Sequence, residues 1–163
     1  MNKAHKFVDC DPDLCTGCTV CEYACSLEKD GVFNPIRSRI RAVRIYPSGN
    51  LAIACRMFED APCVIACPRD ALEQSEIDGH IIVDEDRCDG CGWCVEACDF
   101  GAITVGPNAV AMVCDLCDGE PVCIEICPVE ALSWQTRETA ARKSRIAATA
   151  ARIAASEAAE GEN

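Results

Sequence analysis

The sequence is poor in several features on which other classes of protein depend. Aromatic residues make up only 5% of its 163 residues, so the chain has little material for a large hydrophobic core. It has only two histidines, so a Ser/His/Asp catalytic triad is not predicted. It has no glycine-rich phosphate-binding loop, so a nucleotide site is not predicted either. No stretch approaches the roughly 18 consecutive apolar residues that suggest a membrane span. A fold of this composition needs another source of stability, and bound metal can supply it.

Positive charge is also scarce. The formal net charge is −12, and this argues against nucleic acid as a partner, since a phosphate backbone requires a basic face. Residues 1–136 carry 10 Lys and Arg against 23 Asp and Glu, whereas residues 137–163 carry five against four. The first nine residues contain no apolar segment typical of a signal peptide, so we expect a cytoplasmic protein.

Cysteine, in contrast, is abundant, with 16 copies. Such a density suits a disulfide-stapled secreted domain, a zinc protein or an iron–sulfur protein. In a reducing compartment, clustered cysteines bind metal more often than they bind each other. The cysteines fall into four groups and one outlier: Cys15, Cys18, Cys21 and Cys25; Cys55, Cys63 and Cys67; Cys88, Cys91, Cys94 and Cys98; Cys114, Cys117, Cys123 and Cys127; and Cys10 alone.

The spacing within these groups favours iron–sulfur clusters. The first and third groups have the pattern C-x-x-C-x-x-C-x-x-x-C, which is a bacterial ferredoxin signature. Three thiolates two residues apart converge on three corners of one cubane, and the fourth cysteine points to a different cluster. Zinc sites instead use paired C-x-x-C elements without a third cysteine at the same step. A zinc-binding interaction module is therefore the weaker alternative, and it would be colourless where an iron–sulfur protein is brown.

Short strands are predicted between the cysteine groups. Residues 77–83 and 103–113 have the pattern of hairpins, and leader strands are predicted at 7–8 and 51–54. The unit of strand, cysteine loop, short helix and strand recurs four times. We therefore predict an α+β fold of two bacterial-ferredoxin-like two-cluster modules over residues 1–136, with an insertion at 26–50. The alanine- and arginine-rich residues 137–163 are predicted to form a helical tail.

Four cysteine groups in this order, two of them followed by proline at Pro68 and Pro128, resemble the iron–sulfur subunits of dimethyl-sulfoxide reductase and related oxidoreductases. The resemblance covers residues 6–134. The stretch Cys-Glu-Tyr-Ala-Cys-Ser at 21–26, with Phe33-Asn34-Pro35, is similar to small members that serve carbon monoxide dehydrogenase, hydrogenases and tungsten aldehyde oxidoreductases. Among these, the chain is most similar to the small subunit of the tungsten enzymes.

The resemblance implies how the cysteines are shared among four iron–sulfur clusters. It pairs the first group with the fourth and the second with the third, whereas spacing alone also permits modules built from adjacent groups. The implied ligand sets are Cys15, Cys18, Cys21 and Cys127; Cys114, Cys117, Cys123 and Cys25; Cys88, Cys91, Cys94 and Cys67; and Cys55, Cys63 and Cys98. At least three of the clusters are then of the 4Fe-4S type.

The last of these sets lacks a ligand. The family pattern would place a cysteine at position 58, where this chain has Phe58. The site then holds a 3Fe-4S cluster, or a 4Fe-4S cluster with water, Glu59 or Asp60 on the fourth iron, or it takes its thiolate from Cys10. The simpler interpretation of Cys10 is a reduced free thiol beside the first cysteine loop.

The predicted function is relay of single electrons, because clusters with four thiolate ligands have no open position for a substrate. The chain is then not catalytic alone. Trp93, inside the third cysteine loop, is expected to shield a cluster or fill the core. The resemblance implies a larger catalytic subunit as partner, most similar to a tungsten aldehyde oxidoreductase, with a flavin subunit or soluble carrier as the second partner. The alternatives are a hydrogenase or carbon monoxide dehydrogenase subunit, a free polyferredoxin, and a protein whose clusters are only structural.

Two segments outside the cysteine groups carry further expectations. Arg37, Arg39, Arg41 and Arg44 in the insertion either protect an edge strand or dock on an acidic surface. The tail has an apolar stripe too narrow to be buried in a core, and an isolated helix of its length is marginal in water. We therefore expect the tail to mediate assembly with another subunit.

Overall fold

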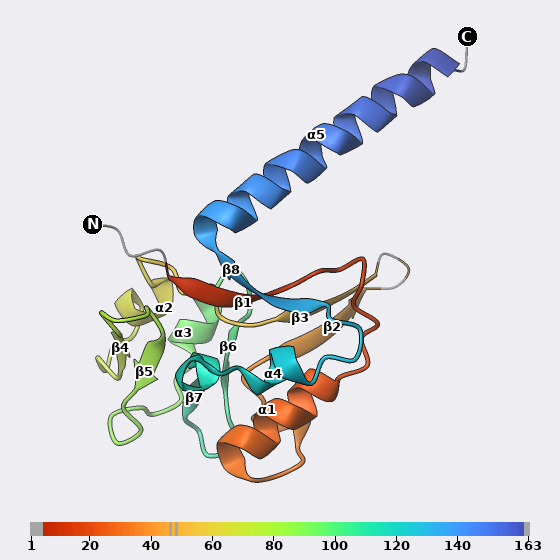
Figure 1. Cartoon of the computed structure of the whole chain (residues 1–163). Helices are drawn as coiled ribbons and strands as arrows, with labels where there is room; N and C mark the ends of the chain where they lie inside the picture. The colour runs from red at the N-terminus through yellow and green to blue at the C-terminus, as the bar shows by residue number, and fades with distance from the viewer. Residues whose placement is uncertain (1–4, 46, 48, 162–163) are drawn as a thin grey trace.

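The fold is assembled from short elements, and only its last helix is long (Figure 1). The computed structural model describes residues 5–45, 47 and 49–161. The helices and 3-10 turns are α1 (Val20–Asp30), η1 (Pro35–Arg37), α2 (Pro62–Ile65), α3 (Trp93–Glu96), η2 (Leu116–Gly119), α4 (Val122–Glu125) and α5 (Arg137–Gly161). The strands are β1 (Lys6–Cys10), β2 (Arg41–Ile45), β3 (Gly49–Ile53), β4 (Leu72–Gln74), β5 (Ile81–Val83), β6 (Ile103–Val105), β7 (Ala111–Val113) and β8 (Leu132–Thr136).

The strands form four separate antiparallel pairs: β1 with β8, β2 with β3, β4 with β5, and β6 with β7. The first pair joins opposite ends of the cysteine-bearing region, with Lys6 opposite Thr136 and Cys10 opposite Leu132. This pairing brings the strand before the first cysteine group beside the strand after the fourth. The predicted mixture of short helices and strands is confirmed, and so is the hairpin at 103–113.

The hairpin predicted at residues 77–83 is wrong in one respect. Its first strand lies earlier, at Leu72–Gln74, and it pairs with Ile81–Val83 across the loop between them. The Ser75 N–H donates to the His80 carbonyl at 2.9 Å and closes this loop, with Gly79 at φ +79°. The Asp78-Gly79 pair therefore lies within a longer connection and does not form a two-residue turn.

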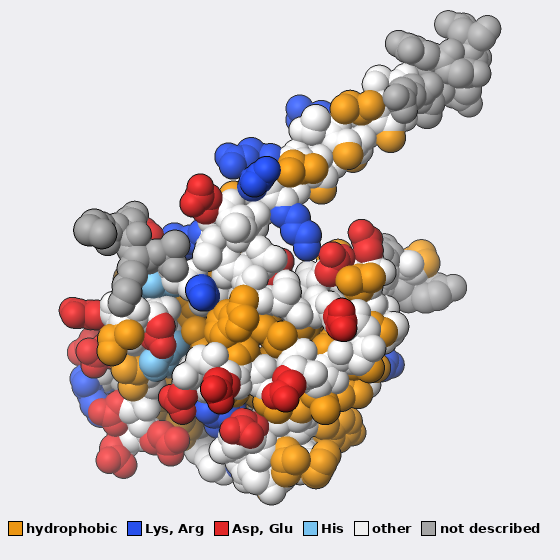
Figure 2. Space-filling model, viewed as in Figure 1, with side chains coloured by type: hydrophobic (Ala, Val, Ile, Leu, Met, Phe, Trp, Pro, Cys, Tyr) orange, Lys and Arg blue, Asp and Glu red, His pale blue; other side chains and the backbone are white. Residues whose placement is uncertain are grey.

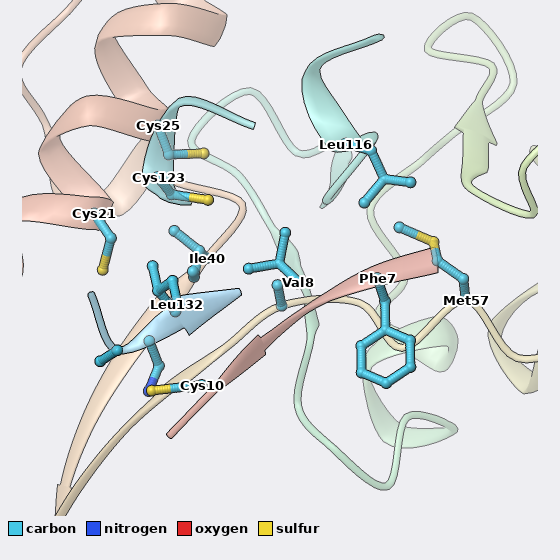
Figure 3. Close-up of a cluster of buried hydrophobic side chains, with 13 residues drawn as sticks. Phe7, Val8, Cys10, Cys21, Cys25, Ile40, Met57, Leu116, Cys123 and Leu132 are labelled. Carbon is cyan, nitrogen blue, oxygen red and sulfur yellow. The ribbon is translucent and has the colours of Figure 1, made fainter. Parts of the chain in front are cut away.

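The buried apolar side chains make two cores. One combines residues from the first and fourth cysteine groups with the insertion, and the other combines the second and third groups (Figure 3 shows the first). Cys55 packs against both cores. Cysteines are prominent members of each, which agrees with a chain that has few aromatic residues to bury. The fully buried Met57 and Ile103 are among the largest side chains of these cores.

The insertion folds back over the first cysteine loop. The Glu22 carboxylate accepts the Ala42 N–H at 3.1 Å, and the Asn50 side chain donates to the Cys15 carbonyl at 3.2 Å. The four arginines of the insertion have partners within the chain. Arg37 and Arg39 pair with Asp30 at 3.3 and 2.7 Å, Arg41 donates to the Pro35 and Ile36 carbonyls, and Arg44 donates to the Gly17 carbonyl. These contacts favour an architectural role for the arginines over the docking role considered above.

The long helix α5 leaves the body directly after β8 and projects away from it (Figure 1). Only its first turns touch the body: Ala140 packs on the first core, and Lys143 pairs with Asp11 at 3.3 Å. Ile146 and Ile153 further along are 60% and 53% exposed. The predicted tail helix is thus present, and its apolar stripe has no cover from the described part of this chain. No helix within the described ranges combines the length and apolarity needed to cross a membrane.

Candidate metal centres

The first cysteine loop and the last cysteine group line one cavity. We call it the Cys18 site, and its cysteines are Cys15, Cys18, Cys21 and Cys127. The walls are small or apolar and include Ala42, Ala52 and Leu132. Residue 127 reaches this loop because the strand that follows it, β8, pairs with the strand that precedes the loop, β1. The four cysteines that the resemblance grouped therefore lie together in the fold.

A second set surrounds Cys25, and we call it the Cys117 site: Cys25, Cys114, Cys117 and Cys123. Helix α1 supplies both Cys21 and Cys25, which share one face of the helix because they are four residues apart. Figure 3 shows Cys25 and Cys123 side by side with their sulfur atoms pointing the same way. Burial and then the neighbouring Cys25 thiol raise the pKa of Cys123 to about 12. Burial also raises the pKa of Cys114 far above its ordinary value.

The second and third cysteine groups line two further cavities. One is the Cys91 site, with Cys67, Cys88, Cys91 and Cys94. The other is the Cys55 site, with Cys55, Cys63 and Cys98. Helices α2 and α3 pack on each other and place one buried cysteine each, Cys63 and Cys94. Both groupings are the ones that the resemblance implies.

The loops repeat a backbone conformation as well as a spacing. The residue two positions after the first cysteine of each group has a positive φ: Gly17, Met57, Gly90 and Leu116, at +66°, +47°, +69° and +65°. At Gly90 a side chain is excluded as well, because a Cβ atom there would lie 2.4 Å from the Ala109 carbonyl oxygen. The second group shares this turn although it lacks the cysteine that follows it in the others. Sequence reasoning missed the repeat because two of the four positions are not glycine.

Backbone N–H groups already point at several of the sulfur atoms. Cys67 accepts from Ala71 at 3.3 Å and Cys98 accepts from Ala102 at 3.4 Å, an i to i+4 contact in both cases. Cys88 accepts from Ala111 at 3.4 Å and Cys25 from Arg39 at 3.2 Å. Hydrogen bonds to sulfur stabilise the negative charge of a cluster and help to set its potential. The donor set and these N–H groups therefore fit iron–sulfur clusters.

Burial favours the protonated form of these thiols, so their thiolates need positive charge close by. Burial, followed by the neighbouring charges, raises the pKa of Cys21 to about 12 and those of Cys63 and Cys94 to about 11. Metal binding replaces these protons with positive charge. No three His, Cys, Asp or Glu side chains in the described part of the chain are arranged around a single ion. A cubane does not need that arrangement, since each of its thiolates binds a different iron corner.

The four sites follow one another in a row. The Cys123 thiol is close enough to Cys21 for the charge of one to affect the other, which links the Cys117 and Cys18 sites. In the same way the charge of Cys55 affects Cys114, which links the Cys55 and Cys117 sites, and the charge of Cys63 affects Cys94, which links the Cys55 and Cys91 sites. The order is therefore Cys18 site, Cys117 site, Cys55 site and Cys91 site. The two exposed cysteines of the chain, Cys18 and Cys91, lie at opposite ends of this row.

The Cys55 site differs from the others in its outer wall. Phe58 and Phe100 line the cavity, with ring centroids 5.4 Å apart. Two guanidinium groups cover the rings: Arg137 lies 4.7 Å from the Phe58 centroid and Arg56 lies 5.6 Å from that of Phe100. The enclosed space is about 40 Å³, against about 10 Å³ at the Cys91 site and 20 Å³ at the Cys18 site. Phe58 thus lines this cavity without filling it.

The oxygen ligands considered from the sequence do not line this cavity. Glu59 lies 3.9 Å from Arg137, and Asp60 is exposed. Asp99, which sequence reasoning did not consider, is a lining residue, and its position directly after Cys98 was the available signal. Cys10 is buried elsewhere: its sulfur accepts the Ala52 N–H at 3.3 Å and its pKa, raised by burial to about 11, is also affected by Cys15. This placement agrees with a thiol beside the first loop.

The fold and the cysteine sites define a ferredoxin-like iron–sulfur protein. Segments 81–104, and 12–29 with 115–130, match the 4Fe-4S binding domain. The chain is 45% identical over 107 residues to the "Aliphatic sulfonate oxidoreductase, polyferredoxin-like subunit" of Pyrococcus furiosus, covering 64% of this chain and 61% of that one. It is 38% identical over 122 residues to the "Putative electron transport protein YsaA" of Escherichia coli, covering 69% and 76%.

A third relative is the "Electron transport protein HydN" of Escherichia coli, 34% identical over 111 residues that cover 62% of this chain and 60% of that one. The chain belongs to the family of iron–sulfur electron-transfer proteins that includes YsaA. It spans about three fifths of the length of the Pyrococcus relative and of HydN.

Proposed function

We propose that this protein is the electron-transfer subunit of an oxidoreductase complex. It relays single electrons between the active-site subunit and a second carrier or a flavin subunit. The observation that carries this proposal is the row of four cysteine sites with an exposed cysteine at each end. A row with two accessible ends suits passage of electrons through the protein, whereas clusters that only stabilised the fold would need no such order. We place the protein in the cytoplasm.

The ligands in this proposal are the four sets of cysteines that line the sites. The Cys18, Cys117 and Cys91 sites each have four thiolates and would hold a 4Fe-4S cluster, which when bound supplies one-electron chemistry. The Cys55 site would hold a 3Fe-4S cluster or a 4Fe-4S cluster with a non-cysteine ligand. The remainder of the chain shields these sites and donates N–H groups to their sulfur atoms, and this role supports a protein that is not catalytic alone.

The proposed domain division follows the contacts of the tail. Residues 1–136 would form the four-cluster domain with its insertion at 26–50, and residues 137–163 the assembly segment. The exposed Ile146 and Ile153 support an assembly role for α5, because the helix buries little of its own surface against the body. A helix of this kind is stabilised when its apolar stripe packs on a partner.

For the active-site subunit we propose a tungsten-dependent aldehyde oxidoreductase. Its support is the similarity of residues 21–26 and 33–35 to the small subunits of such enzymes, together with the relative that serves another oxidoreductase, the aliphatic sulfonate enzyme of Pyrococcus. Hydrogenase and carbon monoxide dehydrogenase systems are the competing assignments, and the metal in the purified complex distinguishes them.

The deciding experiment is anaerobic affinity purification from the native host followed by metal analysis. We expect iron in the tagged chain, tungsten in a large partner chain, and bleaching of the brown colour on reduction. Nickel in the partner would move the assignment to a hydrogenase or carbon monoxide dehydrogenase. Iron without any partner would leave a free polyferredoxin. A colourless chain with zinc would contradict the electron-transfer function itself.

A further inference from the structure

Negative charge is concentrated in one part of the chain. Residues 59–100, which hold the Cys91 site and most of the Cys55 site, carry 12 Asp and Glu against two Lys and Arg. Residues 1–58, in contrast, carry six Asp and Glu against eight Lys and Arg. The only two arginines of the acidic segment are already paired, Arg69 with Asp89 at 2.8 Å and Arg87 with Asp70 at 3.7 Å. Figure 2 shows acidic side chains gathered on the face over β4 and β5.

This acidic segment also presents large apolar side chains to solvent. Trp93, at the start of α3, is 61% exposed, and Ile65 on the neighbouring helix α2 is 79% exposed. The same position in the other three repeats, directly before a cysteine, is occupied by the smaller Val20, Pro62 and Val122. The fold therefore does not require a tryptophan there. The expectation that Trp93 fills the core is wrong, because most of its surface faces solvent.

The exposed cysteine of the Cys91 site lies beside this tryptophan in the same loop. The backbone N–H of Cys91 donates to the Asp89 carboxylate at 3.3 Å, so an acidic side chain caps the loop at the surface. Cys91 is two residues from Trp93 and ends the row of four sites. An electron that leaves the row at this end would cross little protein. Exposed tryptophans are enriched among residues that dominate binding energy at interfaces.

We propose that the surface around Cys91 and Trp93, with the acidic side chains of residues 59–100, is the docking site for a redox protein with a basic surface around its own cofactor. Trp93 and Ile65 provide the central apolar contact, and the surrounding carboxylates attract the partner and orient it. This inference rests on the proposed electron-transfer function and adds the charge of the partner at this end. The Cys18 end differs, because the arginine-rich insertion lies beside its loop, with Arg44 donating to the Gly17 carbonyl.

The test uses the full-length protein loaded with its clusters and a basic cytochrome c as the probe. Electron transfer from the reduced protein to the oxidised cytochrome is followed by stopped-flow absorbance at increasing salt. Binding is measured separately by calorimetry with both proteins reduced, so that no electron moves. We expect the association rate to fall steeply with salt, because screening weakens attraction between exposed charges. Trp93→Ala should weaken binding about 10-fold or more.

Matched variants separate this surface from a general effect of charge or exposure. Phe33→Ala removes an aromatic side chain that is 71% exposed outside the acidic segment, and it should leave binding unchanged. Glu85→Lys with Glu96→Lys should flatten the salt dependence. Glu120→Lys with Glu125→Lys makes the same change of charge in the fourth repeat and should have a much smaller effect, since Glu125 occupies the position there that Glu96 has in the third.

The outcomes that overturn the proposal are distinct from failure of the proposed function. Salt-independent transfer, or equal loss with Phe33→Ala and Trp93→Ala, would show that the surface is not the docking site even if iron content and dye reduction are normal. A dimer that forms through the basic helix α5 of a second copy, and that Trp93→Ala breaks, would also overturn it. Absence of iron from the purified chain would instead contradict the proposed function.

Discussion

Phe58 occupies the position at which the other three cysteine groups have a cysteine. Its ring lines the Cys55 cavity where a thiolate would complete the ligand set, and the space behind it remains open. The N–H groups, the turn at Met57 and the three cysteines are all present. The proposed difference in ligation therefore depends on one side chain, and a substitution there tests it directly.

If the Cys55 site holds the 3Fe-4S cluster of the proposal, Phe58→Cys should add one iron atom per chain and convert that cluster to a 4Fe-4S cluster. The added thiol enters the wall of the cavity and supplies the missing ligand. Electron paramagnetic resonance of the oxidised protein should lose its 3Fe signal, and iron analysis should rise accordingly. Phe100→Cys places a thiol in the same cavity from a different loop and should not have this effect. A spectrum of the unmodified protein with four ordinary cubanes would contradict the 3Fe assignment.

The sequence identifies most of these residues because cysteine spacing carries its own geometry. It does not identify Asp99 or Arg137 beside the Cys55 site, since neither belongs to a repeated pattern. Arg137 reaches Phe58 only because β8 ends beside the second group, a contact between residues far apart in the chain. The left-handed turns at Met57 and Leu116 could not be predicted for a related reason. Glycine is the residue that indicates a positive φ in a sequence, and neither position is glycine.

One partly buried carboxylate, that of Asp30, anchors the start of the insertion between α1 and β3. Asp30 ends α1, and its partners Arg37 and Arg39 lie on either side of the sharp return toward β2. Burial alone would raise the pKa of Asp30, but the hydrogen bonds and charges of Arg39 and then Arg37 outweigh burial and lower it below its ordinary value of 3.8. The carboxylate thus stays ionised throughout the neutral range.

Asp30→Asn should lower the free energy of unfolding by about 1.5–3 kcal/mol, the range for hydrogen bonds that involve charged groups. A depressed folded pKa contributes stability that is fully present above the unfolded pKa and is lost only as pH falls through the folded pKa. The difference between the two proteins should therefore be constant from about pH 5 to 8, where the clusters are intact. Thermal melts across that range measure it, and a difference that shrinks toward pH 5 would contradict the assignment.

The first turns of helix α5 contact the body of the protein, and the rest of the helix projects from it. The composition predicts the helix and a domain boundary at residue 137. Nothing in the sequence indicates that Arg137, Ala140 and Lys143, which follow this boundary, contact the body. The part that projects begins after these contacts. The helix therefore has two roles that a deletion can separate.

A protein that ends at Lys143 should keep its full iron content and lose assembly with its partner. A protein that ends at Thr136 should also lose iron selectively from the Cys55 site, because Arg137 no longer covers Phe58. Iron analysis and the elution volume of the affinity-purified complex measure the two effects. An unchanged complex size for the protein ending at Lys143 would contradict the assembly role of α5.

For the whole molecule, the clusters are as much a part of the core as the apolar side chains. Both cores contain cysteines that face one another, and the chain has few aromatic residues with which to replace them. The two cores and the order of the sites are properties of the fold that cysteine spacing alone leaves open, because adjacent groups would satisfy the same spacing. The pairing of β1 with β8 selects among those arrangements.

Removal of iron with a chelator under reducing conditions should unfold residues 1–136. The thiols left behind are buried and crowded, and the free energy of metal binding is part of the folding free energy in small metal-dependent domains. Circular dichroism and one-dimensional NMR before and after chelation measure the change. A chelated protein that keeps dispersed methyl resonances and its cooperative melt would show that the apolar cores suffice.

The contact between residues 6–10 and 132–136 also has a consequence for synthesis on the ribosome. The Cys18 and Cys117 sites each draw cysteines from the first and the fourth groups, so the Cys117 site cannot be completed until residue 123 has been made, nor the Cys18 site until residue 127. The Cys55 and Cys91 sites use residues 55–98 only and become complete some thirty residues earlier, as counted from Cys98 to Cys127. The cysteines of the two sites in the middle of the chain are thus all synthesised first. The N-terminal cysteines are made early, but the cysteines that complete their sites are made last.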